Sequence, residues 1–214
     1  MTTNKMLKKG ALLVFAKPPI AGQVKTRLIP DIGAEAATNL YKELLTLTLN
    51  TANQTNNLEK QLWLTDNCKH VFFEQFNTKN TFELLQQKGK DLGERMFNAF
   101  EHALNDYNYA VLIGCDCPGL TEEDLTAAAN MLESDKDIVL GPAEDGGYYL
   151  IGLKRNNAKL FSDITWGSSH VFSKTISRAE GLNLNIGLLE TRTDIDRVSD
   201  LKSYEKIKNQ ECSV

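Results

Sequence analysis

The chain has 214 residues, of which 42% are hydrophobic and 24% charged, and its formal net charge is −4. This length and composition predict one soluble domain with a full hydrophobic core. A nucleic-acid-binding protein would favour a basic face, so the acidic balance argues against nucleic acid as the main partner. The N-terminal apolar run is too short to span a membrane, and it lacks the small-residue cleavage site of a signal peptide.

The cysteines show no spacing that predicts disulfides or a metal centre. Cys115 and Cys117 flank Asp116, while Cys68 and Cys212 stand apart from them. No second pair or nearby histidine completes a tetrahedral set, so we expect buried, reduced thiols. Reduced thiols place the protein in the cytoplasm.

Apolar runs alternate with amphipathic stretches along nearly the whole chain. Strands are predicted at residues 11–16, 61–65, 84–87, 110–114, 137–140, 148–153 and 185–189. Helices are predicted at residues 33–53, 96–104, 168–179 and 199–207, and one after Thr121, which forms an imperfect capping box with Asp124. Asp31 is expected to cap the first helix. The alternation predicts a single α/β domain with a mostly parallel sheet, and no linker or repeat interrupts it.

A basic loop follows the first predicted strand. It carries Lys17, Lys25 and Arg27 together with two prolines and Gly22. Because ligands bind beyond the carboxyl ends of parallel strands, these cations can hold a polyphosphate there. The alternative is a solvated basic loop. The spacing is not that of a Walker A motif, and no Gly-x-Gly-x-x-Gly follows the strand, which disfavours P-loop kinases and Rossmann dehydrogenases.

Carboxylates stand at the ends of several other predicted strands. Asp116 ends a buried strand, where a charge is costly unless it is paired or binds a cation, although it could also form a turn or cap a helix. Residues 144–147 form an acidic, glycine-rich turn, and Asp194 and Asp196 precede the last helix, which either could cap. Mg²⁺ prefers one or two carboxylates plus substrate phosphates. Together with the basic loop, these carboxylates suit transfer from a nucleoside di- or triphosphate.

The ordered motifs resemble a known family. Residues 15–18 (FAKP), 22–28 (GQVKTRL), 91–96 (DLGERM), 113–118 (IGCDCP), 141–150 (GPAEDGGYYL) and 194–196 (DID) look like the bacterial radical-SAM/selenodomain-associated transferases. That family belongs to the nucleotide-diphospho-sugar transferases with the GT-A fold. More distantly, the chain is similar to molybdenum-cofactor and phospholactate guanylyltransferases. The resemblance covers about residues 12–201.

The resemblance implies a single-domain three-layer α/β/α sandwich with a Rossmann-like sheet, spanning residues 1–214. Its nucleotide-binding half covers about residues 11–120 and its acceptor half about 121–208. It implies an enzyme that uses Mg²⁺ (or Mn²⁺) to transfer a glycosyl or nucleotidyl group to a small-molecule acceptor. The donor is a nucleotide sugar or a nucleoside triphosphate.

The resemblance also assigns roles to residues. Nucleotide binding falls to Ala16, Lys17, Gly22, Lys25, Arg27, Gln87, Gly93 and Asp116, and catalysis to Asp116, Lys25 and Arg27. The metal ligands are Asp116 and Asp196, which is favoured over Asp194, and the acceptor side holds Asp145, Gly146 and Gly147. Prolines replace the glycines that open the loop of many nucleotidyltransferases, so glycosyl and nucleotidyl transfer both stay open. A catalytically silent nucleotide-binding regulatory module is the alternative function, and the oligomeric state is undetermined.

Overall fold

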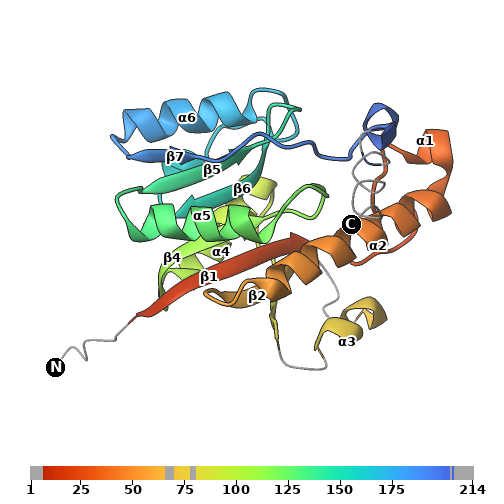
Figure 1. Cartoon of the computed structure of the whole chain (residues 1–214). Helices are drawn as coiled ribbons and strands as arrows, with labels where there is room; N and C mark the ends of the chain where they lie inside the picture. Colours follow the sequence, from red (N-terminus) through yellow and green to blue (C-terminus); the bar gives the residue numbers. More distant parts are fainter. Residues whose placement is uncertain (1–6, 66–69, 78–80, 203, 205–214) are drawn as a thin grey trace.

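A computed structural model describes residues 7–65, 70–77, 81–202 and 204 of the chain (Figure 1). Seven strands form one sheet in the order β3-β2-β1-β4-β6-β5-β7. Their bounds are β1 Lys8–Ala16, β2 Glu59–Leu64, β3 Glu83–Gln86, β4 Tyr107–Ile113, β5 Ile138–Pro142, β6 Tyr148–Leu153 and β7 Ile186–Leu188. All seven overlap predicted strands.

The sheet is mostly parallel, as the sequence predicts. β1 pairs in parallel with β2 and β4, β2 with β3, and β5 with β7. β6 runs antiparallel to both of its neighbours, β4 and β5. β5 and β6 form a hairpin, and β6 pairs with β4. The strands of the second half of the chain therefore extend the sheet that the first half begins.

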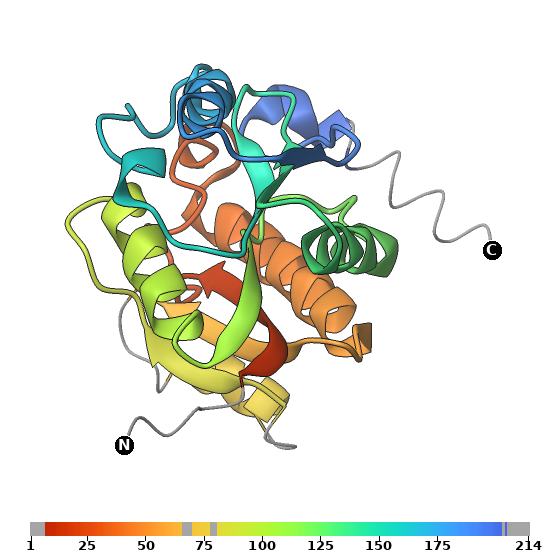
Figure 2. The same cartoon turned by 90° about the vertical axis from the view of Figure 1, so that its left-hand side faces the viewer.

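Helices cover both faces of the sheet. Their bounds are α1 Ile29–Ile32, α2 Ala34–Gln54, α3 Val71–Asn77, α4 Leu92–Ala103, α5 Glu122–Glu133 and α6 Val171–Gly181, with a 3₁₀ turn at Ala158–Leu160. Figure 2 views the sheet nearly along its edge, with α2 and α5 on one side and α4 and α6 on the other. The expected three-layer α/β/α sandwich is therefore confirmed.

β1 contributes side chains to a hydrophobic core on each face of the sheet. Every side chain from residue 11 to residue 16 is buried, because the strand lies in the middle of the sheet with helices on both faces. Leu12 and Val14 pack with α2 and α5, whereas Leu13 and Phe15 pack with α4. This two-sided burial is what the continuous apolar run predicts.

Local signals set the start of two helices. Asp91 caps α4 by accepting a hydrogen bond of 2.9 Å from the Glu94 backbone N–H. Thr121 and Asp124 cap α5 with both reciprocal bonds of a capping box. The predicted box is confirmed.

The predicted cap at Asp31 is wrong. Asp31 lies inside a separate short helix, α1, which has Pro30 in its first turn. This helix ends just before Gly33, whose φ of 80° is positive. Gly33 itself occupies the N-cap position of α2 and makes no side-chain cap.

The remaining differences concern the ends of elements. Helix α3 lies in a region for which the sequence predicts no element, and α6 begins at Val171 rather than at residue 168. Residues 198–202 are helical, while most of the rest of the predicted helix at 199–207 lies outside the described residues. Among the helices that the structure describes, none has the length and apolar character needed to cross a bilayer.

Candidate functional site

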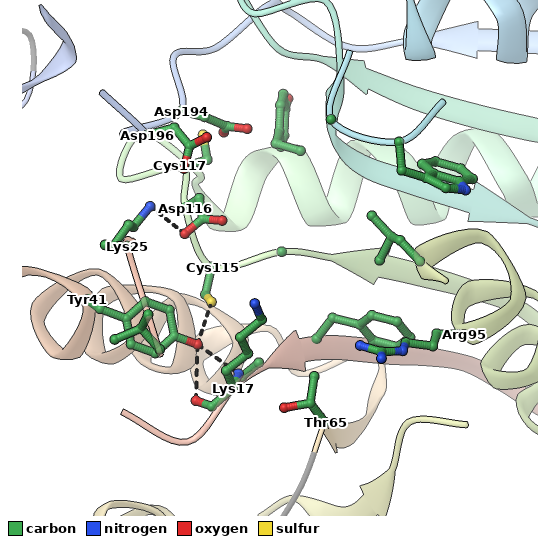
Figure 3. Close-up of a pocket in the computed structure, with 18 of the residues that line it drawn as sticks. Lys17, Lys25, Tyr41, Thr65, Arg95, Cys115, Asp116, Cys117, Asp194 and Asp196 are labelled. Carbon is green, nitrogen blue, oxygen red and sulfur yellow. Dashed lines mark hydrogen bonds and ion pairs between the residues drawn. The ribbon is translucent and has the colours of Figure 1, made fainter. Parts of the chain in front are cut away.

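A cavity of about 570 Å³ opens at the carboxyl ends of β1 and β4. These strands are parallel neighbours, so the loops that follow them meet at one edge of the sheet. The cavity is lined by Lys17 and residues 23–27 of the basic loop, by residues 114–117 after β4, by Asp194 and Asp196, and by Asp145, Tyr148, Tyr149 and Trp166 from the second half of the chain. The fold thus brings the predicted basic loop and the predicted carboxylates into one pocket (Figure 3).

Two of the three cations in the basic loop are paired with carboxylates of the same site. The Lys25 side chain is only 2% exposed, and its Nζ lies 2.5 Å from Asp116 Oδ1. Lys25 Nζ also donates to the Ile195 carbonyl. Arg27, which is half exposed, pairs with Asp196. Lys17 forms no ion pair with the carboxylates in the described part of the chain, so its charge is open to a ligand.

Residues 194–196, the late acidic segment, are hydrogen-bonded directly to the loop that follows β4. The Ile195 backbone N–H donates to the Asp116 carbonyl at 2.8 Å. Figure 3 shows Asp194 and Asp196 beside Asp116, with the Lys25 side chain directed at Asp116. Residues about eighty positions apart therefore share one acidic cluster. The sequence could propose this meeting only through the family resemblance.

Asp194 and Asp196 differ in their surroundings. Asp194 Oδ1 is buried and has no hydrogen-bond partner among the described residues. Burial, followed by repulsion from Asp116 and Asp145, raises the pKa of Asp194 to about 7, although nearby Lys25 opposes the rise. The Asp196 carboxylate is instead bound by Arg27. The free buried oxygen belongs to Asp194, whereas the sequence favoured Asp196 as the second metal ligand.

The acidic cluster fits a divalent cation that prefers oxygen. No group of three or more His, Cys, Asp or Glu side chains forms a ready-made metal centre in the ranges that the structure describes. Mg²⁺ needs fewer protein ligands than that, since it keeps waters and binds substrate phosphates. Asp116, with a 46% exposed side chain, and the unpartnered oxygen of Asp194 supply two carboxylates.

Ala16 and Gln87 line the cavity, where the resemblance placed the nucleotide. The Gln87 side chain is buried, and its Nε2 donates to the Ala16 carbonyl at 3.2 Å and the Trp63 carbonyl at 2.9 Å. Its amide hydrogens therefore hold the ends of β1 and β2 in place. The amide oxygen remains the group with which Gln87 can meet a ligand.

Four predicted site glycines do not line the cavity: Gly22, Gly93, Gly146 and Gly147. A Cβ on Gly93 would lie 2.7 Å from the Trp166 ring and 2.8 Å from the Phe161 carbonyl. A Cβ on Gly146 would lie 2.1 Å from the Ser169 carbonyl oxygen. Gly93 and Gly146 are therefore needed for close packing behind the site. Trp166 and Asp145, which neighbour them in space or sequence, do line it.

Tyr41 is a site residue that the sequence analysis missed. Its buried hydroxyl accepts a hydrogen bond of 2.8 Å from the Lys17 backbone N–H and lies 3.1 Å from the Lys17 carbonyl. The Cys115 thiol donates to the same oxygen at 3.3 Å. Tyr41 therefore joins the start of the basic loop to the residue before Asp116. In sequence it appears only as one apolar position of an amphipathic helix.

Cys115 and Cys117 are buried free thiols, as the sequence predicts, whereas Cys68 and Cys212 lie outside the described residues. Burial raises the pKa of both thiols to about 12. They are thus protonated near neutral pH, which suits packing and not nucleophilic chemistry.

An ion pair that the sequence analysis also missed anchors the late acidic segment. Arg192 binds the Asp124 carboxylate through Nε at 2.7 Å and Nη2 at 2.9 Å. The Asp124 side chain is 9% exposed, so this bidentate pair is largely shielded from water. It attaches the chain just before Asp194 to helix α5.

We expect Arg192→Met to lower the free energy of unfolding by about 3 kcal/mol, because a buried carboxylate loses its partner. Chemical denaturation measures the change. The control is Lys136→Met, which removes a more exposed pair with Asp135 and should cost about 1 kcal/mol or less. Equal losses in the two variants would show that the Arg192 pair is no stronger than a surface pair.

Comparison with protein families matches residues 48–168 to the family DUF2064, described as an uncharacterized protein conserved in bacteria. No curated protein matches the chain. Among solved structures, the chain is 31% identical to a protein from Desulfovibrio desulfuricans G20 that is provisionally assigned as a nucleotide-diphospho-sugar transferase. The TM-score is 0.81, over 90% of this chain and 84% of that one.

More distant structures share the fold. CMP:2-keto-3-deoxy-manno-octonic acid synthetase, solved with CTP, is 11% identical with a TM-score of 0.63, over 95% of this chain and 100% of that one. Rv0371c from Mycobacterium tuberculosis H37Rv, solved with manganese, is 16% identical with a TM-score of 0.56, over 92% and 98%. These identities show the fold alone. The predicted likeness to nucleotide-diphospho-sugar transferases is borne out by the match to the provisionally assigned protein from Desulfovibrio desulfuricans G20, while an association with radical-SAM or selenium proteins stays a prediction.

Proposed function

The chain belongs to the bacterial DUF2064 family, and from this premise we propose that it is a divalent-metal-dependent transferase. It takes a nucleotidyl group from a nucleoside triphosphate, or a glycosyl group from a nucleotide sugar, and passes it to a small acceptor. The observation that carries this proposal is one cavity lined both by the cations Lys17, Lys25 and Arg27 and by the carboxylates Asp116, Asp194 and Asp196. Cations for phosphates beside carboxylates for a metal ion are the parts that such transfer requires.

The two reactions differ in the bond that breaks. In nucleotidyl transfer an acceptor oxygen attacks the α-phosphorus, the bond to the bridging oxygen breaks, and pyrophosphate leaves. In glycosyl transfer the acceptor attacks the anomeric carbon and a nucleoside diphosphate leaves. Negative charge grows on the departing phosphates in both cases. Lys17 and Arg27 stabilise that charge from the basic loop, which lowers the barrier.

Asp116 and Asp194 would hold the metal ion, and this choice replaces Asp196 because Asp196 is bound by Arg27. When bound, a divalent cation supplies positive charge beside the reacting phosphates. Asp145 is the cavity carboxylate contributed by the turn between β5 and β6, where it accepts from the Gly147 N–H at 2.8 Å. We assign it to contact with an acceptor hydroxyl.

A thermal-shift screen tests the donor class. Nucleoside triphosphates and nucleotide sugars are each added with and without Mg²⁺ or Mn²⁺. A ligand at 100 times its dissociation constant stabilises the folded state by about 2.7 kcal/mol, so the donor should raise the melting temperature only when metal is present. If none of the nucleotides stabilises the protein with either metal, the proposal is wrong.

Product analysis with the stabilising donor then separates the reactions. Release of pyrophosphate indicates nucleotidyl transfer, and release of a nucleoside diphosphate indicates glycosyl transfer. Metal-dependent nucleotide binding with no turnover across acceptor classes would instead favour a catalytically silent regulatory module.

A further inference from the structure

The side chain of Lys25 is not placed as in a typical phosphate-binding loop. A phosphate-binding lysine is expected to direct its ammonium group into the open cavity, yet the Lys25 side chain is only 2% exposed. Its Nζ contacts Asp116 Oδ1 and the Ile195 carbonyl, two oxygens that belong to the acidic side of the site. The ammonium group is therefore held between two oxygen atoms that accept from it.

The backbone at Lys25 adopts an unusual conformation. Its φ is 47°, a left-handed value that non-glycine residues seldom adopt. Strained backbone persists only where surrounding contacts hold it, and it concentrates at functional sites. Here the contacts of the ammonium group with Asp116 and Ile195 connect the basic loop to the acidic segment. The loop conformation and the position of this charge are thus linked.

The same oxygens are those that a divalent cation would use. Asp116 is bound by Lys25 on one oxygen, and Oδ1 of Asp194, which lines the same cavity, has no hydrogen-bond partner in the described chain. An ammonium group and a metal ion repel each other strongly at contact distance. The two cations cannot both be bound to Asp116 at low cost.

We propose that Lys25 is the resident cation of the acidic site in the nucleotide-free protein, and that a divalent metal ion binds well only when nucleotide phosphates draw the ammonium group away from Asp116. Lys25 then has two partners, Asp116 before the nucleotide arrives and the phosphates afterwards. The second part of this inference, in which nucleotide phosphates draw Lys25 away from Asp116, rests on the proposed function. It makes metal and nucleotide binding mutually dependent.

The proposal makes an expectation opposite to that for a simple phosphate contact. Removing the Lys25 charge should strengthen metal binding in the absence of nucleotide. We expect Lys25→Met to bind Mn²⁺ about tenfold more tightly than the unaltered protein, since a positive charge at contact distance is lost from the site. Titration of Mn²⁺ into nucleotide-free protein, with free Mn²⁺ followed by electron paramagnetic resonance, gives the dissociation constants.

Lys17→Met is the matched control, because Lys17 lines the same cavity and pairs with none of the described carboxylates. It should change Mn²⁺ affinity by about twofold at most, as a more distant, solvated charge does. An equal gain in both variants would show a general charge effect and overturn the proposal. So would Mn²⁺ affinity in Lys25→Met that is no higher than in the unaltered protein.

Folding of the variants is checked by a cooperative thermal transition. Lys25→Gly serves as the second variant, because glycine adopts a φ of 47° without strain. Failure of both variants to fold would mean that Lys25 is required by the structure, which also overturns its role as a resident cation. These titrations contain no nucleotide. If Lys25→Met binds Mn²⁺ more tightly but no nucleotide binds in the thermal-shift screen, the proposed transferase function is wrong. The role of Lys25 as the resident cation of the acidic site would still hold.

Discussion

Asp116→Asn is expected to lower turnover at least about 100-fold, as the loss of one well-placed electrostatic group does. Asp116 faces the cavity with a 46% exposed side chain, beside Lys25 and the acidic segment. Asparagine keeps the shape of the residue but removes the charge that a metal ion needs. Steady-state kinetics with the donor found by the thermal-shift screen, at several Mg²⁺ concentrations, measures the loss.

Asp137→Asn is the control for this substitution. Asp137 precedes β5 at the opposite end of that strand from the cavity, and its Oδ2 accepts from the Asn185 N–H at 2.9 Å. An asparagine oxygen can accept the same bond, so turnover should stay within about twofold of the original. If Asp116→Asn kept normal metal-dependent turnover, Asp116 would not be a metal ligand.

Asp194→Asn is expected to raise the metal concentration needed for nucleotide binding by about tenfold, because the site loses one of two carboxylates. The same change should leave the metal-free protein at least as stable as before. Burial disfavours the charged form of Asp194, and the residue lies near Asp116 and Asp145, so removing its charge relieves both costs. Thermal unfolding with nucleotide across a Mg²⁺ series, and without metal, measures both effects.

Asp196→Asn is the matched comparison, two residues away in the same segment. Asp196 is paired with Arg27, so its loss should leave the metal requirement for nucleotide binding within about twofold. A large shift in metal requirement for Asp196→Asn, with none for Asp194→Asn, would restore Asp196 as the second ligand. That outcome would mean that Arg27 leaves Asp196 when the metal ion binds.

The strands and most of the helices follow from sequence alone, as does the position of the basic loop and of Asp116 at the ends of predicted strands. The apolar run at residues 11–16 is continuous because β1 is buried on both faces, and Thr121 with Asp124 specifies the start of α5 through contacts three residues apart. Such signals are local, so a sequence shows them directly. The basic loop and Asp116 follow parallel neighbouring strands, and this topology alone brings them to one edge.

The tertiary structure alone decided how the charges pair. Sequence spacing gives no reason for Lys25 to contact Asp116, for Arg27 to contact Asp196, or for Asp194 to keep the unpartnered oxygen. It also gave no sign that Tyr41 would bind the basic loop. These contacts join residues separated by 24 to 169 positions. Each pairing depends on the distance between two side chains in the folded chain, and local sequence patterns carry no information on that distance.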